Sequence, residues 1–563
     1  MVDVPRDVRY VVVSGGVISG VGKGVVAASL AKILKEHGYH VTLIKIDPYI
    51  NYDAGTLRPT EHGEVWVTCD GGEIDQDLGN YERFINDDIP KTNSITTGQI
   101  YKAVIDRERQ GGYLGQTVQF IPHIIDEIVD RVHSAARGYD FAIVEIGGTV
   151  GDYENSPFLY AFKTIEQKKG RDVVAHIFVT YLPIPEHINE MKSRPTRQAL
   201  ARLGEHGIIP QFIVCRSSIA LDERRKEKIQ EFAYLSQECI ISAPDTETVY
   251  QVPLEFERQN FGKNLLAYFS MSSRKQVEWQ PWIDSVGHLL RARQFVKVGI
   301  IGKYLWSGDY SITDSYVSIY HALLHAGITH NVGITPVWID AHTLTSYDEC
   351  EKKLAELNGI IVPGGFGADG VEGKIRAIQY ARTSLMPFLG ICYGLQLAVV
   401  EYARTICHLP DAHTTEVDEL TKNPVIDLLP HQKNLLASNR YGATMRLGVY
   451  PATLIQNTRV YTLYKNTSRL QEKKGEMYVL ERHRHRYEVN VQYIDLLAGA
   501  GLAFSAFYKN EQSIPLVEFI EISDHPFFIA TQAHPEFTSR FENAHPLFTG
   551  FISAAAPHGS VHP

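Results

Sequence analysis

The sequence predicts an α/β protein made of two doubly wound domains, each with a mainly parallel sheet between layers of helices. Three observations carry this prediction. The chain has 563 residues, which is too long for one ordinary core. Short apolar strands alternate with helical segments in both halves. A polar stretch without a strand of its own separates the two halves.

In the first half, apolar runs bounded by turn residues are expected to be strands. Strands are expected at 10–13, 41–46, 141–145, 174–180 and 211–215, and clear helical segments at 25–36 and 124–136. Because parallel strands need crossover segments that are usually helices, this alternation indicates a parallel sheet. We expect the first domain to cover residues 1–270.

The second half is expected to begin after a linker at 271–296, which is polar and then amphipathic. Strand and helix alternation then resumes through KVGIIGKY, NGIIVPGGFG and PFLGICYGLQLAVV, and ends in the strand FFIATQAH. We expect a second domain over residues 297–555 and a frayed tail at 556–563.

The composition is typical of a soluble globular protein, with 44% hydrophobic and 21% charged residues. A formal net charge of −10 argues against a general nucleic-acid binder. The sequence has no signal-peptide pattern and no window of 18 uncharged apolar residues, so we expect no membrane association and a cytoplasmic location. The six cysteines show no CxxC pairing, which argues against a zinc ribbon or a disulfide framework.

The segment SGGVISGVGKG, residues 14–24, follows the first expected strand and opens the first expected helix. In such a loop, backbone N–H groups and the helix dipole point at one spot, and Lys23 adds a positive charge, so the segment predicts a phosphate site. The pattern departs from Walker A, because Gly16 and Gly22 are one residue too far apart and Gly24 replaces the Ser or Thr that usually binds Mg²⁺. A glycine turn with a solvated lysine is the alternative.

Carboxylates elsewhere in the first half are candidates for the missing metal ligands, because Mg²⁺ prefers carboxylate oxygens. Asp75 and Asp77 lie in GGEIDQDLGNYERF, and Glu145 ends an expected buried strand. We predict that Asp77 and Glu145 hold the metal; the alternatives are a solvated turn and a paired structural charge. Lys45 lies inside an apolar strand, where a buried cation needs an anionic partner, and a second phosphate contact is the simplest interpretation.

A nucleophile is predicted at Cys392 in PFLGICYGLQLAVV, at a turn between a strand and a helix whose N-terminus favours a thiolate. A lone cysteine is more often an inert core residue. Here FFIATQAHPEF supplies remote partners, since His534 and Glu536 are two residues apart on one face of an expected strand end. We expect Glu536 to orient His534, and His534 to activate Cys392. The other five cysteines are assigned no chemistry.

Oxyanion donors are expected from the glycine turn VPGGFG, residues 362–367. The N–H groups of Gly365 and Tyr393 are suitable, and the loss of one such donor typically costs about 10² to 10³ in rate. By itself the segment would be an ordinary turn, but beside Cys392 it completes an acyl-transfer site.

Together these motifs resemble the CTP synthase family from about residue 8 to residue 553. The motifs that carry the resemblance are SGGVISGVGKG, IKIDPYIN, HGEV, GGEIDQDLGNYERF, YLGQTVQFIPHI, VEIGGTVGDYE, KSRPTR and HRHRYEV. The SGVGKG form of the loop resembles the eukaryotic branch. The second half is similar to class I glutamine amidotransferases. The resemblance therefore implies an N-terminal P-loop-like amidoligase domain and a C-terminal glutamine amidotransferase domain.

The resemblance implies ATP-dependent amination of UTP to CTP, the last step of de novo CTP synthesis. ATP would phosphorylate O4 of UTP, and ammonia from glutamine would displace the phosphate. Two triphosphates must then lie side by side, and positioning and charge neutralisation would do most of the catalytic work. Because ammonia is mostly protonated in water, an internal passage between the two sites is also implied.

The same resemblance assigns the site residues. ATP and Mg²⁺ are expected at Gly20, Val21, Gly22, Lys23, Gly24, Val25, Lys45, Asp77 and Glu145. UTP and the product CTP are expected at Ser19, Asp152, Tyr153, Glu154, Lys192, Ser193, Arg194, Pro195, Thr196, Arg197 and Lys228. Glutamine is expected at Gly365, Tyr393, Gly394, Leu395, Gln396, Glu416 and Arg486. The alternatives are a solvated loop for KSRPTR and a solvated basic strand for Arg482 and Arg484.

The resemblance also implies feedback inhibition by CTP, activation by GTP, and a homotetramer whose pyrimidine site lies between subunits; members of the family also stack into filaments. One departure bears on GTP. After GGFG many members have a bulky residue and then Arg-Gly, whereas this chain has Ala368, Asp369 and Gly370. An aspartate near a triphosphate effector is unfavourable by charge.

Three other functions compete with this interpretation. A P-loop ATPase switch with an inactive glutaminase predicts a broken triad, but Cys392, His534 and Glu536 are all present. A structural role in filaments would add to the activity and not replace it. An amidotransferase with another acceptor would lack KSRPTR and GDYE, and both are present.

Overall fold

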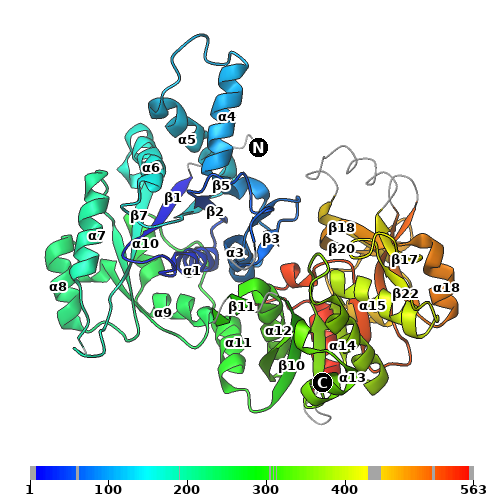
Figure 1. Ribbon diagram of the computed structural model, residues 1–563. Coiled ribbons are helices and arrows are strands. Elements are labelled where there is room, and N and C mark those ends of the chain that lie inside the picture. The colour runs from blue at the N-terminus through cyan, green and yellow to red at the C-terminus, as the bar shows by residue number, and fades with distance from the viewer. Residues whose placement is uncertain are drawn as a thin grey trace. The chain divides into compact units, whose positions relative to one another are not determined.

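The computed structural model describes residues 8–58, 63–188, 190–303, 306–307, 310–311, 314–428, 445–509 and 514–556. The predicted tail therefore lies outside the described residues, apart from residue 556. The chain forms two compact units, coloured from blue to red along the sequence in Figure 1. Unit 1 holds residues 1–56 and 76–286, and unit 2 holds residues 57–75 and 287–563.

Unit 1 is built on a seven-stranded parallel sheet with the order β5-β2-β6-β1-β7-β8-β9. The strands are β1 (Arg9–Gly15), β2 (Val41–Asp47), β5 (Ser94–Thr96), β6 (Phe141–Ile146), β7 (Val174–Tyr181), β8 (Phe212–Ser217) and β9 (Ile240–Pro244). The five predicted strands are confirmed. The two strands that the sequence did not reveal, β5 and β9, are short and form the sheet edges.

Helices cover both faces of this sheet. α1 (Lys23–Glu36) contacts β1, β2 and β6, and packs with α3 (Asp77–Ile85), α9 (Val252–Arg258) and α10 (Phe261–Tyr268). On the other face, Tyr10 and Val12 share a core with α4 (Thr97–Arg109), α5 (Ile125–Ala135), α6 (Ser156–Lys169), α7 (Arg194–Glu205) and α8 (Glu223–Ala233). Because both faces are buried, the strands are continuous apolar runs, which is why they were visible in the sequence.

Unit 2 contains a ten-stranded mixed sheet with the order β13-β10-β14-β15-β24-β23-β22-β18-β20-β19. The parallel part is β13 (Gly333–Asp340), β10 (Phe295–Gly302), β14 (Gly359–Val362), β15 (Phe388–Ile391) and β24 (Phe528–Thr531). The antiparallel part is β23 (Pro515–Glu521), β22 (Ala503–Lys509), β18 (Arg446–Leu454), β20 (Glu476–His485) and β19 (Gln471–Lys473).

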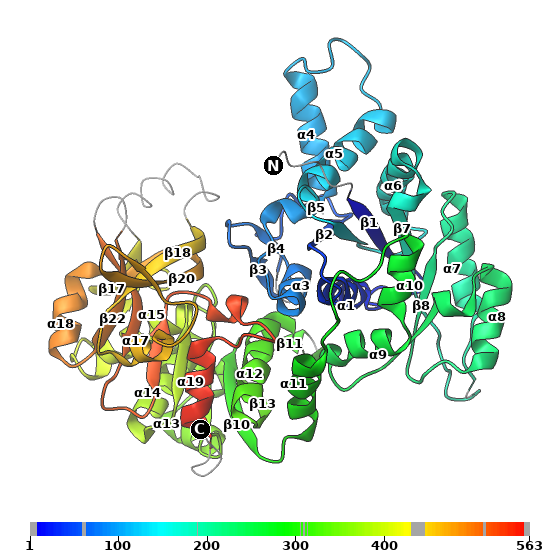
Figure 2. The ribbon, with the colours of Figure 1, turned by 180° about the vertical axis from the view of Figure 1, so that it is seen from behind.

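Two apolar cores lie on the two faces of this sheet. α13 (Tyr347–Leu354), α14 (Val371–Ser384) and α15 (Tyr393–Thr405) share one core. The other core contains α12 (Val317–His330), α17 (Arg459–Tyr464) and α19 (Pro546–Ala555), with α12 beside α19 (Figure 2). The doubly wound arrangement predicted for the second half is therefore present in its parallel part.

The structure differs from the predicted domain boundary at one hairpin. Strands β3 (Val65–Val67) and β4 (Glu73–Asp75) lie inside the predicted first domain but pack in unit 2. Trp66 is fully buried, Arg482 of β20 donates a hydrogen bond to the Val67 carbonyl at 3.1 Å, and Val449 N–H donates to the Cys69 carbonyl at 3.0 Å. These contacts join segments about 400 residues apart in the chain, so no local pattern could reveal them.

The predicted linker also carries a helix. α11 (Gln280–Arg291) occupies part of residues 271–296. Its Trp282 is buried beside Phe84 and Tyr250, and the indole N–H donates to the Tyr250 carbonyl at 2.8 Å. The first part of the expected linker is therefore anchored in the core of unit 1, and the units divide after residue 286.

Candidate active sites

The glycine-rich loop of unit 1 lies where the sequence predicted it, between β1 and α1. Gly20 and Gly22 have φ angles of 71° and 95°, in the left-handed region that favours glycine. Helix α1 begins at Lys23, so Gly24 and Val25 form its first turn. The Lys23 ammonium donates to the Gly148 carbonyl at 2.8 Å, and its burial lowers the pKa of Lys23. The loop thus presents a helix N-terminus and a buried cation at one place.

Lys45 is buried in β2 directly opposite Glu145 in the parallel register with β6. Its ammonium lies 3.4 Å from Glu145 and 3.6 Å from Asp47, and it also pairs with Asp77. Burial alone would lower the pKa of Lys45, but the three carboxylates outweigh it and raise the pKa well above its usual value. The anionic partners that the buried Lys45 was expected to need are therefore carboxylates of the protein itself.

Asp77 and Glu145 converge on the loop, as expected for metal ligands. A Cβ atom placed on Gly24 would lie 3.2 Å from Asp77 Oδ1 and 3.4 Å from Glu145 Oε2, so glycine leaves room between them. Burial raises the pKa of Glu145, which also accepts a hydrogen bond from Tyr81. Two carboxylates beside a phosphate loop fit Mg²⁺, which takes its remaining ligands from phosphate and water. No group of three or more His, Cys, Asp or Glu side chains in the described ranges is arranged to hold a metal.

The other candidate acid, Asp75, belongs to the other unit. It is the last residue of β4 in unit 2, whereas Asp77 is the first residue of α3 in unit 1.

The residues predicted to bind UTP or CTP lie at several places on unit 1. Asp152 and the 3₁₀ turn Tyr153–Asn155 follow β6, and Tyr153 is 82% exposed. The KSRPTR segment begins α7, with Ser193 at its N-cap. Ser193 and Lys228 line one cavity together with Arg224 and Arg225. The structure therefore brings part of KSRPTR together with Lys228, and Ser19 lies exposed in the glycine-rich loop.

In unit 2, Cys392 occupies the sharp turn between β15 and α15. Its φ and ψ angles are 51° and −98°, a conformation that non-glycine residues seldom adopt, and it is the N-cap of α15. Its N–H donates to the Thr531 carbonyl of β24 at 2.7 Å. A Cβ atom on Gly394 would lie 2.1 Å from the Val362 carbonyl, so a side chain there is excluded. The predicted strand, sharp turn and helix are confirmed, and the nucleophile role of Cys392 stays a prediction.

His534 and Glu536 are paired, but not on a strand as expected. Strand β24 ends at Thr531, and Glu536 lies in a short 3₁₀ helix (Pro535–Thr538) that His534 caps. The turn still brings His534 Nδ1 within 2.7 Å of Glu536 Oε1. Burial alone would lower the pKa of His534, but Glu536 and Cys392 outweigh it and raise the pKa to about 10. Glu536 therefore orients the ring and stabilises its protonated form.

The opposite ring nitrogen of His534 is directed to the nucleophile. A Cβ atom on Gly364 would lie 2.9 Å from His534 Cε1 and 3.7 Å from the Cys392 Cβ, so both side chains flank this glycine. His534 Nε2 is buried and forms no hydrogen bond with a described residue. Cys392 is nevertheless close enough to raise the pKa of the His534 ring. Catalytic hydrogen bonds are often long before substrate binds.

Two further groups contact the Cys392 thiol. The Sγ atom is 3.7 Å from the Arg484 carbonyl, to which the thiol donates, and 3.7 Å from the Gln532 side-chain amide. Gln532 was not found from the sequence. It lies in the same TQAH segment as His534, but only the pairing of β15 with β24 places its amide beside the Cys392 thiol.

The turn at residues 362–367 is held by several side chains. The Tyr393 hydroxyl donates to the Gly367 carbonyl at 2.9 Å, and Glu416 accepts from the Gly367 N–H at 2.7 Å. Lys303 donates to the Phe366 carbonyl. Burial raises the pKa of Glu416, while Lys303 and Arg486 are cations near it. Glu416 and Arg486, predicted to bind glutamine, therefore lie together beside this turn.

The remaining residues predicted to bind glutamine lie in the first turn of α15, where Gly394, Leu395 and Gln396 are buried. Gln396 Nε2 donates to the Tyr487 carbonyl at 2.9 Å, and its Oε1 atom is buried without a partner among the described residues.

The β3–β4 hairpin forms one wall of this site. Glu73 accepts a hydrogen bond from Arg484 Nε at 2.8 Å, and the Arg484 guanidinium lies 5.3 Å from the Phe366 ring centroid. The Trp66 ring lies 4.9 Å from Phe537, which stacks on His534 at 5.0 Å and 9°. Two chains of contact thus lead from the hairpin to the catalytic side chains. Arg482 and Arg484 are not a solvated basic strand, because the Arg482 side chain is fully buried and Arg484 is paired.

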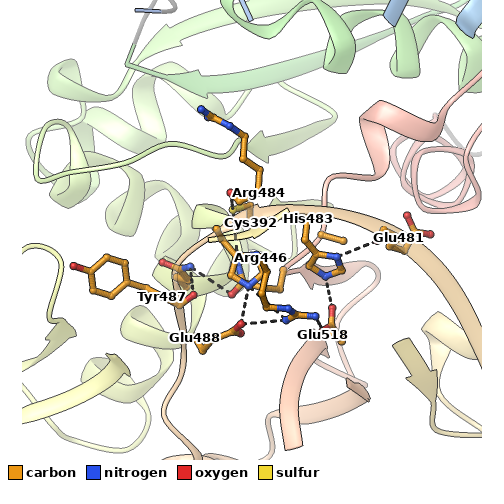
Figure 3. A network of polar contacts seen from close by, with 12 residues as sticks. Cys392, Arg446, Glu481, His483, Arg484, Tyr487, Glu488 and Glu518 are labelled. Atoms are coloured by element: carbon orange, nitrogen blue, oxygen red, sulfur yellow. Dashed lines mark hydrogen bonds and ion pairs between the residues drawn. The ribbon is translucent and has the colours of Figure 1, made fainter. Parts of the chain in front are cut away.

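The opposite face of β20 carries a buried ion network (Figure 3). Arg446 lies 2.7 Å from Glu518 and 3.1 Å from Glu488, and His483 lies 2.6 Å from Glu518. Burial would raise the pKa of Glu518, but Arg446 and His483 lower it to about 2. Burial lowers the pKa of His485 to about 4, so this ring is neutral at pH 7. The network fixes the strand whose Arg484 carbonyl meets Cys392.

The fold and the geometry fit one class of protein: an α/β unit with a glycine-rich loop at a helix N-terminus, joined to an α/β unit with the Cys, His and Glu arrangement of class I glutamine amidotransferases. The family models agree, since residues 9–271 match the CTP synthase N-terminus and residues 311–554 match the class I glutamine amidotransferases. The chain belongs to the CTP synthase family and is a ligase that uses glutamine.

Two curated relatives support this placement along nearly the whole chain. The CTP synthase of Methanocaldococcus jannaschii is 46% identical over 555 residues, which cover 97% of this chain and 98% of that protein. The CTP synthase of Pyrococcus furiosus is 46% identical over 547 residues, with the same coverage. The glutaminase domain of Trypanosoma brucei CTP synthase, solved with bound acivicin, is 33% identical and covers 46% of this chain and 93% of its own, with a TM-score of 0.41.

Two expected absences concern membranes and disulfides. In the described ranges, none of the helices combines the length and the apolar character needed to cross a membrane. All six cysteines are free thiols.

Proposed function

We propose that the chain phosphorylates UTP at O4 with ATP and replaces that phosphate with ammonia that its own Cys392 site releases from glutamine. This proposal rests on two groups of side chains that lie close together in the structure. Asp77 and Glu145 flank the glycine-rich loop of unit 1. In unit 2, His534 is paired with Glu536 and lies beside Cys392. One set suits phosphoryl transfer and the other suits acyl transfer.

In the glutaminase half-reaction, His534 takes the thiol proton and the Cys392 sulfur attacks the side-chain amide carbon of glutamine. The N–H groups of Gly365 and Tyr393 stabilise the oxyanion. The protonated ring then gives its proton to the nitrogen, the C–N bond breaks, and ammonia leaves a glutamyl thioester. Water hydrolyses the thioester to glutamate and restores the thiol. Glu536 keeps the ring protonated until the nitrogen departs, which the raised pKa of His534 supports.

In the ligase half-reaction, O4 of UTP attacks the γ-phosphorus of ATP, ADP leaves, and the N3 proton of the uracil ring passes to water. Ammonia then adds at C4, phosphate departs with the former O4, and the new exocyclic nitrogen loses its extra proton to give CTP. Mg²⁺ held by Asp77 and Glu145 would neutralise phosphate charge. Lys23 and Lys45 orient the phosphates, and Ser19, KSRPTR, Lys228 and residues 152–154 bind the pyrimidine nucleotide.

The proposal extends to regulation and assembly. CTP inhibits the enzyme and GTP activates its use of glutamine. Four copies of the chain form a homotetramer that completes the pyrimidine site, and these tetramers stack into filaments. Asp369 does not exclude GTP, because its carboxylate lies 2.6 Å from His342 Nε2, and Asp369 and Asp340 raise the pKa of that histidine. Because these carboxylates favour the protonated form of His342, the ring offsets part of the repulsion between Asp369 and a triphosphate. The cytoplasmic location stays a prediction.

The experiment that tests the proposal measures CTP formation from UTP, ATP and Mg²⁺ with glutamine or with ammonium chloride, each with and without GTP. We expect CTP from both nitrogen sources and a GTP effect confined to glutamine. CTP from ammonium alone would contradict the glutaminase part. No CTP from either source would contradict the whole proposal, and equal rates with and without GTP would remove GTP from it.

A further inference from the structure

Lys374 is a buried lysine that the steps above leave unused. It lies in the first turn of α14, and its side chain has no exposed surface. Its Nζ atom is 3.5 Å from the Pro363 carbonyl, and a Cβ atom on Gly365 would lie 3.7 Å from the same Nζ. The ammonium group therefore lies directly behind the turn that carries the expected oxyanion donor.

The surroundings of Lys374 are unusual for a buried cation, because it forms no ion pair with a carboxylate in the described part of the chain. Its charge is thus not cancelled at short range, although burying an unpaired ammonium is costly. The charged or titratable groups that face it are Lys303 after β10, Asp369 before α14, and Cys392 at the start of α15. The Tyr393 ring lies 5.7 Å from Nζ.

These groups set the charge of Lys374 near neutral pH. Burial is the largest influence and lowers its pKa to about 7; Lys303 lowers it further, whereas Cys392 and Asp369 raise it. The interaction with Cys392 is reciprocal, so a positive charge on Lys374 favours a negative charge on the sulfur. In a site closed to water such an interaction is stronger than at a surface.

Three side chains contact carbonyl groups of the turn at residues 362–367. Lys374 meets the carbonyl of Pro363, Lys303 that of Phe366, and the Tyr393 hydroxyl that of Gly367. The Pro363 carbonyl shares its peptide group with the Gly364 N–H, so Lys374 fixes the peptide group that precedes the one carrying the Gly365 N–H, and the contacts at Phe366 and Gly367 fix the turn after it. Lys303 and Tyr393 lie toward the outer end of the turn, whereas Lys374 holds the end nearest Cys392 and His534.

We propose that Lys374 is a positioning residue of the glutaminase reaction: its ammonium group holds the Pro363 carbonyl and supplies the internal positive charge that favours the Cys392 thiolate and the oxyanion formed from glutamine. This inference rests on the proposed nucleophile. Lys374 neither gives nor takes a proton in the reaction itself, and the thiol proton still passes to His534.

The test compares wild type with Lys374→Met, which keeps the length of the side chain and removes its charge. The measured quantity is the wild-type to variant ratio of glutamine-dependent kcat/KM from pH 6 to pH 9. Lys374 is charged below its pKa of about 7 and neutral above it. We therefore expect a ratio of about 10 to 100 at pH 6, comparable with the loss of an oxyanion donor, and a clear decrease toward pH 9. A ratio that is constant with pH would show a structural role and overturn the proposal.

A second variant, Lys374→Gln, retains an N–H donor for the Pro363 carbonyl but carries no charge. It should lose activity at pH 6 as Lys374→Met does, and wild-type activity at pH 6 would overturn the proposal. Tyr393→Phe removes an uncharged contact with the same turn and serves as the matched control. The wild-type to Tyr393→Phe ratio of glutamine-dependent kcat/KM should not change with pH. CTP formation from ammonium should stay at the wild-type rate in both Lys374 variants, which shows that the chain is folded.

Cys392→Ala, measured in parallel, separates the two proposals. Loss of glutamine use in Cys392→Ala together with a flat Lys374 ratio contradicts only the role of Lys374. Retained glutamine use in Cys392→Ala contradicts the proposed function itself.

Discussion

The two candidate sites hold their charges in opposite ways. Around Lys45 in unit 1, Asp47, Asp77 and Glu145 surround one ammonium group, and the site gathers fixed charges of both signs before any ligand binds. Around Cys392 in unit 2, the groups in contact are a carbonyl, an amide and a ring whose protonation Glu536 controls.

The difference matches the chemistry of each reaction. Phosphoryl transfer brings large permanent charges that must be neutralised and positioned, whereas acyl transfer creates charge for a moment on sulfur, oxygen and imidazole. The first site is therefore expected to fail when one carboxylate is removed, for either nitrogen source. The second should fail only for glutamine. The predictions below separate the sites on this basis.

Asp77→Ala removes a carboxylate of unit 1. We expect CTP formation to fall by at least about 10³-fold with glutamine and with ammonium, because phosphate charge is no longer neutralised. Initial rates with both nitrogen sources at saturating Mg²⁺ measure this. Asp87→Ala changes an acid whose side chain is 64% exposed and should keep the wild-type rate. Activity of Asp77→Ala near the wild-type rate would remove Asp77 from the metal site.

Cys392→Ala removes the nucleophile of unit 2. We expect glutamine-dependent CTP formation to fall by at least about 10³-fold while the ammonium-dependent rate stays unchanged, because the second reaction uses no thiol. Glutamate release and CTP formation are measured together. Cys407→Ala, in the same unit, is the control and should behave as wild type. An equal loss with both nitrogen sources would place Cys392 outside the glutaminase reaction.

Glu518→Gln tests whether the buried network under β20 acts through charge. The pKa of about 2 in the folded chain lies below the ordinary value of 4.5, so the pairing stabilises the fold above pH 4.5 and is lost as pH falls through 2. We expect the variant to lose about 3 kcal/mol of unfolding free energy at pH 7. The difference from wild type, followed by chemical denaturation, should shrink between pH 4.5 and pH 2.

The exposed Glu472→Gln on β19 is the control for that measurement. A stability difference that stays constant down to pH 2 would mean that packing, and not the charge of Glu518, stabilises the network.

Glu73→Gln has the smallest expected effect and tests the hairpin wall. The Glu73–Arg484 pair is largely buried, with 12% and 15% of the two side chains exposed. We expect glutamine-dependent kcat/KM to fall about 3- to 10-fold, because Arg484 carries the carbonyl that meets Cys392, while ammonium-dependent CTP formation changes less. Equal changes with both nitrogen sources would show that the hairpin affects unit 1 as much as the glutaminase site.

The local motifs were visible in the sequence because each depends on neighbours within about 15 residues. The glycine-rich loop needs only a strand, glycines with positive φ and a helix start, and residues 9–36 supply all three. Cys392 likewise sits between a strand and a helix with glycines on both sides. Fully buried strands show as apolar runs, so the first sheet was predictable apart from its short edge strands, and so were β10, β14, β15 and β24 of the second. Strand β13 and the antiparallel strands of the second sheet were not predicted.

Chain order misled the prediction where packing joins distant segments. The hairpin at 65–75 belongs by sequence to the first domain, but its Trp66 is buried against Phe537 and its Glu73 pairs with Arg484 of β20. His534 and Glu536 were expected on a strand, and the backbone instead enters a 3₁₀ helix that begins at a proline. Spacing by two residues is compatible with both geometries, so the sequence could pair the side chains without deciding the backbone.

The sequence by itself predicted the two α/β units, the glycine-rich loop, the carboxylates beside it and the Cys392, His534 and Glu536 set, because short-range pattern and residue chemistry specify them. Tertiary structure alone decided that the Gln532 amide lies beside Cys392, that Lys374 lies behind the turn at 362–367, that Glu73 pairs with Arg484, and that Lys45 is surrounded by carboxylates. These side chains come together only through strand pairing and helix packing across as many as 411 residues, and burial then sets their charge. A linear pattern does not contain that information.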